Sequence, residues 1–475
     1  MKMFGRPSLA LSGLLMGSAV AIAHGFGFAD FTPLPASAGP TVDESAPITF
    51  GNPAFRQWSI ADRQSQLGLL MPNSGNWDMI TTNETGRRRG RYLFTVFETG
   101  SSGVQRHDLR TGQTETIWQS MGTPGHRSFD ASFWTPWGTF ITAEESWTTA
   151  ANGSNSPYGR LFELRNPIDA PAVYEPLNAF SNDGADFVHR NVIPRTSHEG
   201  IQFDSDWNMY FIDELDGGNI YKFVSSATKR DVRRGKADYF AAGQTFVLRV
   251  GDGNTPNATG SYSWVPFTTP SGTALPGALT IIDTNGVTSV DARNTTNLAG
   301  FKGTDYMRPE DLQLQKTHKG EFLYVATTTT NEVYRLDLRR QTIAVFANRD
   351  TIDLATGAPI GTALASPDNL ALDHDGFVYI VEDRNGGVDD DIWFAADWNG
   401  DGDLLDENEG LGRWASNGTP GSEFSGLYFD PKRPHRAWVN IQHPASGNDR
   451  MIEIYAGHHR NDDKGADTDA ADDDK

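Results

Sequence analysis

Acidic and amide residues recur at the ends of six similar apolar segments of this chain. The segments begin near Arg91, Gly138, Asn208, Glu321, Gly376 and Ala437, and each continues through a polar turn into a second short strand pattern. The residues at the ends of the first strands include Glu98, Glu144, Glu145, Asp213, Glu214, Glu382, Asp383, Asn440 and Gln442. Carboxylate and amide oxygens are ligands for hard cations such as calcium. The pattern therefore predicts a metal site, provided that the fold brings these ends together.

The segment from Thr135 to Glu145 carries the most specific of these signals. A Pro-Trp-Gly turn leads into an apolar strand that ends in Glu144 and Glu145. Adjacent carboxylates raise each other's pKa, and a bound cation relieves this repulsion. We expect Glu144 and Glu145 to be metal ligands.

Three short polar motifs precede other apolar strands. They are Ser197-His198-Glu199-Gly200, Arg308-Pro309-Glu310 and Ser422-Glu423-Phe424-Ser425-Gly426. We expect them to lie in loops that face a shared axis. Glu199, Glu310 and Glu423 could then ligate metal, or they could cap loops and form salt bridges. Arg308 could bind phosphate through its forked guanidinium, or it could lock a loop to a carboxylate.

A separate motif resembles the first half of an EF-hand calcium loop. Asp397, Asn399 and Asp401 occupy positions 1, 3 and 5, Gly402 occupies position 6, and Asp403 follows. Position 12 is Asn408 instead of glutamate, although Glu409 comes next. We expect a second calcium site in this loop, and a solvated Asp/Gly turn is the alternative.

The elements that must position these residues are predicted to be all-β. A two-stranded unit cannot bury both of its faces alone, so six copies imply a ring of blades. We therefore predict a six-bladed β-propeller with a metal site at the mouth of its central channel, and we expect the first strand of each copy to be the innermost. The segment LTIID (279–283) is a weak candidate for a seventh repeat.

The composition of the chain excludes several kinds of partner and of site. The chain has 475 residues and a formal net charge of −21, which argues against nucleic acid or an anionic membrane surface as partners. It has no cysteine, which excludes disulfides, thiolate ligands and a cysteine nucleophile. The oligomeric state is left open by the sequence.

The two ends of the chain differ in composition from its middle. Residues 1–23 have basic Lys2 and Arg6, an apolar run too short to span a membrane, and small residues at its end, as in a Sec-type signal peptide. We therefore expect a periplasmic or secreted protein. Residues 24–50 are predicted to form a linker or clasp, 51–458 the propeller, and 459–475 a disordered acidic tail.

Five motifs in order, TPWGTFITAEE, SHEG, RPED, SPDNLALDHDG and WVNIQHP, resemble the PhoX-type bacterial alkaline phosphatases. The resemblance runs in scattered motifs from about residue 130 to 445. It implies a six-bladed propeller that hydrolyses phosphate monoesters with iron and calcium ions at the channel mouth. The family's functional residues fall on Glu199, Arg308, Glu310 and Glu423. In the best-known branch a cysteine ligates iron where this chain has Ala143.

The resemblance implies an exported, metal-dependent phosphoesterase that acts on a small phosphorylated substrate. In this interpretation Glu144 or Glu145, Glu199, Glu310 and Glu423 hold the metal, and Arg308, Glu310 and Glu199 act at the reacting phosphate. Because the thiolate ligand is absent, oxygen ligands favour Ca²⁺, with Fe³⁺ or Mn²⁺ as alternatives. Two other functions stay open: a lactonase or phosphotriesterase on the same scaffold, and a non-catalytic calcium-binding propeller at the cell surface.

Overall fold

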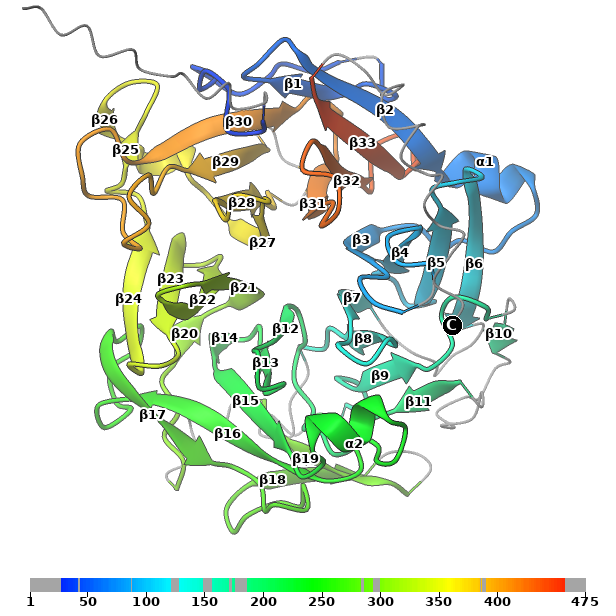
Figure 1. Ribbon diagram of the computed structural model, residues 1–475, viewed down its shortest axis with the longest axis vertical. Helices are drawn as coiled ribbons and strands as arrows, with labels where there is room; N and C mark the ends of the chain where they lie inside the picture. Colours follow the sequence, from blue (N-terminus) through cyan, green and yellow to red (C-terminus); the bar gives the residue numbers. More distant parts are fainter. Residues whose placement is uncertain are drawn as a thin grey trace, which may run out of the picture.

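A computed structural model describes residues 27–41, 43–86, 88–120, 128–147, 156–170, 173–175, 186–282, 286–293, 300–384, 386 and 390–457. Six antiparallel blades surround a common axis (Figure 1). The innermost strands β3, β7, β12, β21, β27 and β31 each contact the innermost strands of both neighbouring blades. The predicted six-bladed β-propeller is confirmed. The predicted signal peptide and acidic tail lie outside the described residues.

Each blade has four strands, which follow one another from the axis outward. The first three blades are β3 (Trp77–Thr82), β4 (Tyr92–Phe97), β5 (Gly103–Asp108) and β6 (Gln113–Ser120); β7 (Phe129–Trp134), β8 (Phe140–Glu144), β9 (Leu161–Leu164) and β11 (Phe187–His189); and β12 (Ile201–Phe203), β13 (Met209–Ile212), β15 (Ile220–Ser225) and β16 (Gly243–Val250). The last three are β21 (Pro309–Thr317), β22 (Gly320–Thr327), β23 (Glu332–Asp337) and β24 (Thr342–Ala347); β27 (Pro367–Leu372), β28 (Val378–Glu382), β29 (Asp391–Ala395) and β30 (Leu411–Asn417); and β31 (Glu423–Phe429), β32 (Arg436–Gln442), β33 (Arg450–Ala456) and β2 (Phe55–Asp62).

The last blade closes the ring because it combines both ends of the described chain. Its outer strand β2 pairs antiparallel with β33, from Phe55 opposite Ala456 to Asp62 opposite Arg450. Before β2, the chain runs along the fifth blade, where β1 (Ile48–Phe50) pairs with β30. Phe28 packs there against Trp414 and Phe429.

The remaining elements lie outside the four-stranded blades or extend them. They are β10 (Val173–Glu175), β14 (Asp216–Gly218), β17 (Gly260–Pro266), β18 (Leu279–Ile282), β19 (Thr288–Asp291), β20 (Tyr306–Met307), β25 (Ile352–Asp353), β26 (Ala358–Pro359), α1 (Arg63–Gly68), α2 (Lys229–Arg233) and η2 (Gly361–Ala363). Leu279–Ile282 of the LTIID segment form β18, which among the described strands pairs only with β19 in a separate two-stranded sheet and so adds no seventh blade. Among the described residues, no helix is long and apolar enough to cross a membrane.

The core of the described chain consists of six apolar clusters, one between each pair of neighbouring blades. In strand β4, side chains that alternate between the two faces contribute to two clusters at once. Phe94 and Val96 pack toward the second blade, whereas Leu93 and Phe97 pack toward the sixth. Successive side chains of a strand point to opposite faces, so one apolar strand stabilises two interfaces.

The expectation that the first strand of each repeated segment is innermost is wrong. Those strands are β4, β8, β13, β22, β28 and β32, and each is the second strand of its blade. The second strand pairs on both edges and packs between two blades, so it is the most continuously apolar. The innermost strand is the one before it in the chain, and an acid lies within two residues of its start.

Candidate metal centre

Every blade places at least one carboxylate within two residues of the start of its innermost strand. One such residue from each blade belongs to what we call the inner ring, which consists of Asp78, Asp130, Glu199, Glu310, Asp368 and Glu423. The fourth blade also has Asp311, whose oxygens accept the N–H groups of Leu312 and Leu370. All inner-ring acids are buried except Asp368, which is partly buried. The innermost strands surround the axis (Figure 1), so one end of the propeller gathers six acids.

A repeated backbone contact sets a second ring beside the first. In five blades, a residue just after the second strand donates its N–H to the carbonyl two residues before the inner-ring acid. The pairs are Glu98 to Asn76 (2.9 Å), Glu145 to Ser128 (2.8 Å), Glu214 to Ser197 (3.0 Å), Thr328 to Arg308 (3.0 Å) and Asp383 to Ser366 (3.0 Å). The second ring thus contributes the carboxylates Glu98, Glu145, Glu214 and Asp383.

Local backbone geometry directs the inner-ring acids. Asn76, Ser128, Arg308 and Ser366 all have positive φ, which non-glycine residues adopt rarely. In the same four blades the strand register shifts beside the acid, as in a β-bulge. Bulges re-aim side chains and are frequent beside functional sites. In these four blades, the inner-ring acid is therefore oriented by the same combination of a left-handed residue and a β-bulge.

The carboxylates of both rings affect one another strongly. Burial raises the pKa of Asp130 well above its usual range, and the charge of Asp78 adds to this. Burial raises the pKa of Glu310 to about 8, although the Arg308 guanidinium opposes the effect. Burial and then the charge of Glu145 raise the pKa of Glu98 and of Glu214. The concentration of negative charge is therefore costly unless protons or cations offset it.

Three of these acids converge closely enough to hold one ion. Carboxylate oxygens of Glu199, Glu214 and Glu310 lie within 4.8 Å of one another, and all three residues are buried. Among the described residues, Glu199 Oε2 and Glu310 Oε2 are buried without a hydrogen-bond partner, as are Asp130 Oδ1 and Glu423 Oε2. Buried carboxylate oxygens normally have partners. The donor set therefore fits a hard, oxygen-binding cation.

Arg308 places its guanidinium directly against these acids. Its Nη2 donates to Glu214 Oε1 at 2.7 Å, and its Nε lies 3.2 Å from Glu310 Oε1. The guanidinium also lies over the ring of Trp147, 4.6 Å from the ring centre. Burial lowers the pKa of Arg308, but the charges of Glu310 and Glu214 outweigh it and raise the pKa. The side chain keeps 24% of its surface exposed, so a cationic edge remains accessible beside the acids.

Glu144 and Glu145, predicted as a ligand pair, point to different environments. Glu145 belongs to the second ring and accepts a hydrogen bond from the indole of Trp147. Both oxygens of Glu144 bind Arg160: Oε2 accepts from its backbone N–H and Nε, at 3.0 and 2.8 Å, and Oε1 accepts from Nη2 at 2.6 Å. This buried ion pair occupies the carboxylate, so we remove Glu144 from the candidate ligand set.

The other predicted residues fall at or beside the inner ring. Glu423 is an inner-ring acid, and its Oε1 is hydrogen-bonded to His443 Nε2. His198 is fully buried next to Glu199, and burial lowers its pKa to about 3, so its ring is neutral. The side chain of Ala143 packs in the apolar cluster between the second and third blades.

The sequence motifs did not predict Asp78, Asp130 and Asp368 as site residues, and they placed Glu214 only at the end of a strand. Each of the three aspartates stands two residues after a left-handed residue, as Glu310 does. The signal available in the sequence was an acid near the start of the strand that precedes each repeated apolar segment.

The second predicted site lies on the loop between β29 and β30, away from the innermost strands. Asp397 and Asp401 meet there with Glu409. The side chain of Asp403 instead accepts the N–H of Leu405 at 3.0 Å, and Asn399 Nδ2 donates to Asp406 at 2.6 Å. The predicted loop therefore brings acids together, but with Glu409 in place of Asp403.

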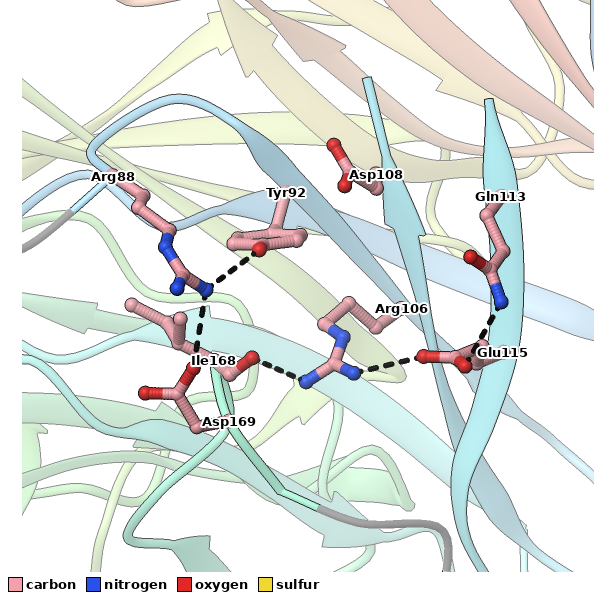
Figure 2. Close-up of a pocket in the computed structure, with 8 residues that line it drawn as sticks. All are labelled: Arg88, Tyr92, Arg106, Asp108, Gln113, Glu115, Ile168 and Asp169. Carbon is pink, nitrogen blue, oxygen red and sulfur yellow. Dashed lines mark hydrogen bonds and ion pairs between the residues drawn. The ribbon is translucent and has the colours of Figure 1, made fainter. Parts of the chain in front are cut away.

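A polar pocket on the outer part of the first blade gathers two arginines (Figure 2). Arg88 forms an ion pair with Asp169 at 3.1 Å, and Arg106 forms one with Glu115 at 2.9 Å. Carboxylates thus neutralise both guanidinium groups. This pocket is therefore a weak site for an anion, although it contains two arginines.

Strand pairing and the two carboxylate rings define the molecule as a six-bladed propeller with an acidic axial site. The model of the family "Alkaline phosphatase PhoX" matches residues 66–445. The chain therefore belongs to the PhoX alkaline phosphatase family, which supports a hydrolase of the phosphatase type.

No curated protein matches the sequence. Among solved structures, virginiamycin B lyase from Staphylococcus aureus is similar over 84% of this chain and 99% of its own, with 12% identity and a TM-score of 0.42. The β-propeller domain of Cps50 (Swd1) from Myceliophteria thermophila is similar over 81% of this chain and 98% of its own, with 15% identity and a TM-score of 0.38.

Proposed function

We propose that this protein is an exported, metal-dependent phosphatase that hydrolyses phosphate monoesters. The observation that carries the proposal is the position of Arg308 against the cluster of Glu199, Glu214 and Glu310. A site that combines cation ligands with an accessible guanidinium suits a phosphoryl group, which needs both kinds of positive charge. Membership of the PhoX family supports the same reaction.

The metal would be held by Glu199, Glu214 and Glu310, with Glu145 and Glu423 as neighbouring oxygen donors. A cation bound there supplies Lewis acidity, which polarises the phosphoryl oxygens and makes an attacking water more acidic. The absence of cysteine and the all-oxygen donor set favour Ca²⁺, and Mn²⁺ or Fe³⁺ are the alternatives. We also propose export through the Sec-type signal at residues 1–23, to the periplasm or the medium.

The protein's own residues would bind and orient the ester. Glu214 and Glu310 fix the guanidinium of Arg308 from one side, and Trp147 covers one of its faces. This arrangement limits the rotamers of Arg308 and keeps its remaining N–H groups ready for a phosphate oxygen. Trp147 is 44% exposed, so its ring can also contact the organic part of the ester.

Two other functions remain alternatives. A lactonase or phosphotriesterase would use the same cation ligands on a neutral substrate, and a structural calcium propeller would need no substrate contact. Arg308 favours the phosphomonoesterase, because an accessible cation beside the ligands matches the dianionic charge of a monoester.

The test is a substrate panel on the purified protein, combined with elemental analysis. We expect bound metal and phosphate release from monoesters at a rate well above that from diesters, triesters and lactones. Preferential hydrolysis of a lactone or triester would support the second function. Bound calcium without hydrolysis of any substrate would support the third.

A further inference from the structure

The loop between β29 and β30 carries a dense group of acids on the outer part of the fifth blade. Between Asp397 and Glu409 the sequence has six carboxylates and no basic residue. Carboxylate oxygens of Asp397, Asp401 and Glu409 lie within 4.8 Å of one another. Exposed acids often cluster without binding a ligand. The evidence for a bound cation therefore depends on the burial and the hydrogen bonds of the buried member of this group.

Glu409 is that buried member, with only 3% of its surface exposed. Its Oε1 accepts the backbone N–H of Asn399 at 3.3 Å, across the loop. Its Oε2 is buried and has no hydrogen-bond partner in the part of the chain that the structure describes. A buried carboxylate oxygen without a partner is destabilising unless a cation is bound.

The first six residues of the loop are folded as a cation-binding loop requires. Asp397 Oδ2 accepts the N–H of Gly402 at 2.9 Å, and Asn399 Oδ1 accepts the N–H of Asp401 at 2.8 Å. Gly402 has a φ of +93°, a backbone conformation that residues with a side chain rarely adopt. This conformation favours glycine at the sharp turn, as at position 6 of an EF-hand loop.

The loop also joins the fifth blade to the fourth. Lys319 Nζ donates to the carbonyl of Gly400, and Arg335 Nη1 donates to the carbonyl of Asp401 at 3.3 Å. Leu404 is buried in the apolar cluster between these blades. Trp398 Nε1 closes the base of the loop by donating to the carbonyl of Asn408 at 3.0 Å.

We propose that Asp397, Asp401 and Glu409 form a structural calcium site, separate from the axial centre, that fastens the fifth blade to the fourth. Calcium is the cation that fits, because the ligands are all oxygens on an irregular loop and calcium accepts variable geometry. The acidic ligand at the end of the loop is Glu409, one position later than in an EF-hand. The site is independent of phosphatase activity and of ions at the axis.

Limited proteolysis can probe this loop, because Leu405 at its tip is 86% exposed and its cleavage product can be told by mass from cleavage at other exposed leucines, such as Leu69 and Leu70. A protease that cleaves after leucine is applied to the full protein with calcium, with magnesium and with chelator, and cleavage after Leu405 is followed by mass spectrometry. We expect calcium to slow this cleavage at least tenfold in the wild type, and magnesium to do so much less.

Glu409→Gln and Asp397→Asn should abolish the protection, while the matched variant Glu407→Gln, an exposed acid of the same loop, should keep it. Calcium counted by equilibrium dialysis should fall by one ion per chain in the first two variants only. Unchanged protection or an unchanged calcium count in a folded Glu409→Gln or Asp397→Asn protein would overturn the proposal. So would an unprotected wild type.

Discussion

The guanidinium of Arg308 lies 4.6 Å from the ring centre of Trp147, at the edge of the carboxylate rings. Replacing Trp147 by alanine removes this cation–π contact and frees the rotamers of Arg308. We predict that KM for a phosphate monoester rises roughly 2- to 5-fold, with a smaller change in kcat. Steady-state kinetics would measure both values.

Trp147→Phe, which keeps an aromatic ring, should retain most of the affinity for substrate. Trp398→Phe, at the other exposed tryptophan of the described chain, should leave KM unchanged. An unaltered KM in Trp147→Ala would mean that Arg308 is held by its carboxylates alone.

Glu199→Gln and Glu310→Gln each remove one negative charge from the axial cluster but keep the size of the side chain. We predict that either change lowers bound metal and phosphatase activity by at least tenfold, because each removes an anionic ligand. Metal content and phosphate release would be measured on the same samples, and circular dichroism would verify folding. Wild-type turnover of either variant at limiting metal would show that the ion is held elsewhere.

Glu144→Gln should act on stability instead of metal binding. The change leaves the buried Arg160 guanidinium without its counter-charge, which costs about 3–5 kcal/mol of unfolding free energy. Urea unfolding measures this cost. Glu115→Gln breaks the more exposed ion pair with Arg106 and should cost about 1 kcal/mol or less. A loss of bound metal from a stable Glu144→Gln protein would restore Glu144 as a ligand.

Sequence patterns predicted the number of blades because the second strand of each blade is buried on both faces. Its apolar residues recur at every repeat, as in β4 and β28. The same patterns predicted the wrong strand as the innermost one, because the true innermost strands mix polar and apolar residues. The strand with the strongest apolar signal is thus the most buried one, and it is not the one nearest the axis.

Prediction of the candidate site was likewise partial. Glu199 and Glu310 could be predicted as site residues because their motifs contain distinctive neighbours, His198 and Arg308. Asp78 and Asp130 stand in ordinary strand sequences, and only the left-handed residue and the bulge reveal their equivalence to Glu310. The partner of Glu144 could not be predicted, because Arg160 lies on the neighbouring strand edge and is 16 residues away in sequence.

Acid should destabilise the protein partly through His107. Burial lowers the pKa of His107 from 6.5 to about 4, so the folded protein keeps this ring neutral while the unfolded chain protonates it below pH 6.5. Above pH 6.5 the ring is neutral in both states, so His107 costs the protein no stability. As the pH falls from 6.5 to 4, protonation of the unfolded chain lowers the free energy of unfolding by roughly 3 kcal/mol in total.

We predict that the difference in unfolding free energy between wild type and His107→Gln shifts in favour of the variant over that pH range. Urea unfolding at pH 7 and at pH 4.5 would measure the shift. His318→Gln, at an exposed histidine, is the matched control. A pH-independent difference between wild type and His107→Gln would contradict the prediction.

The most direct test of the axial site is phosphate release from a simple monoester before chelation, after chelation and after calcium is restored. The carboxylate rings predict that chelation abolishes release and lowers the thermal midpoint, and that calcium, or manganese or iron if one of these is the resident ion, restores both. Full activity of protein verified to be free of metal would contradict a metal-dependent phosphatase at this site.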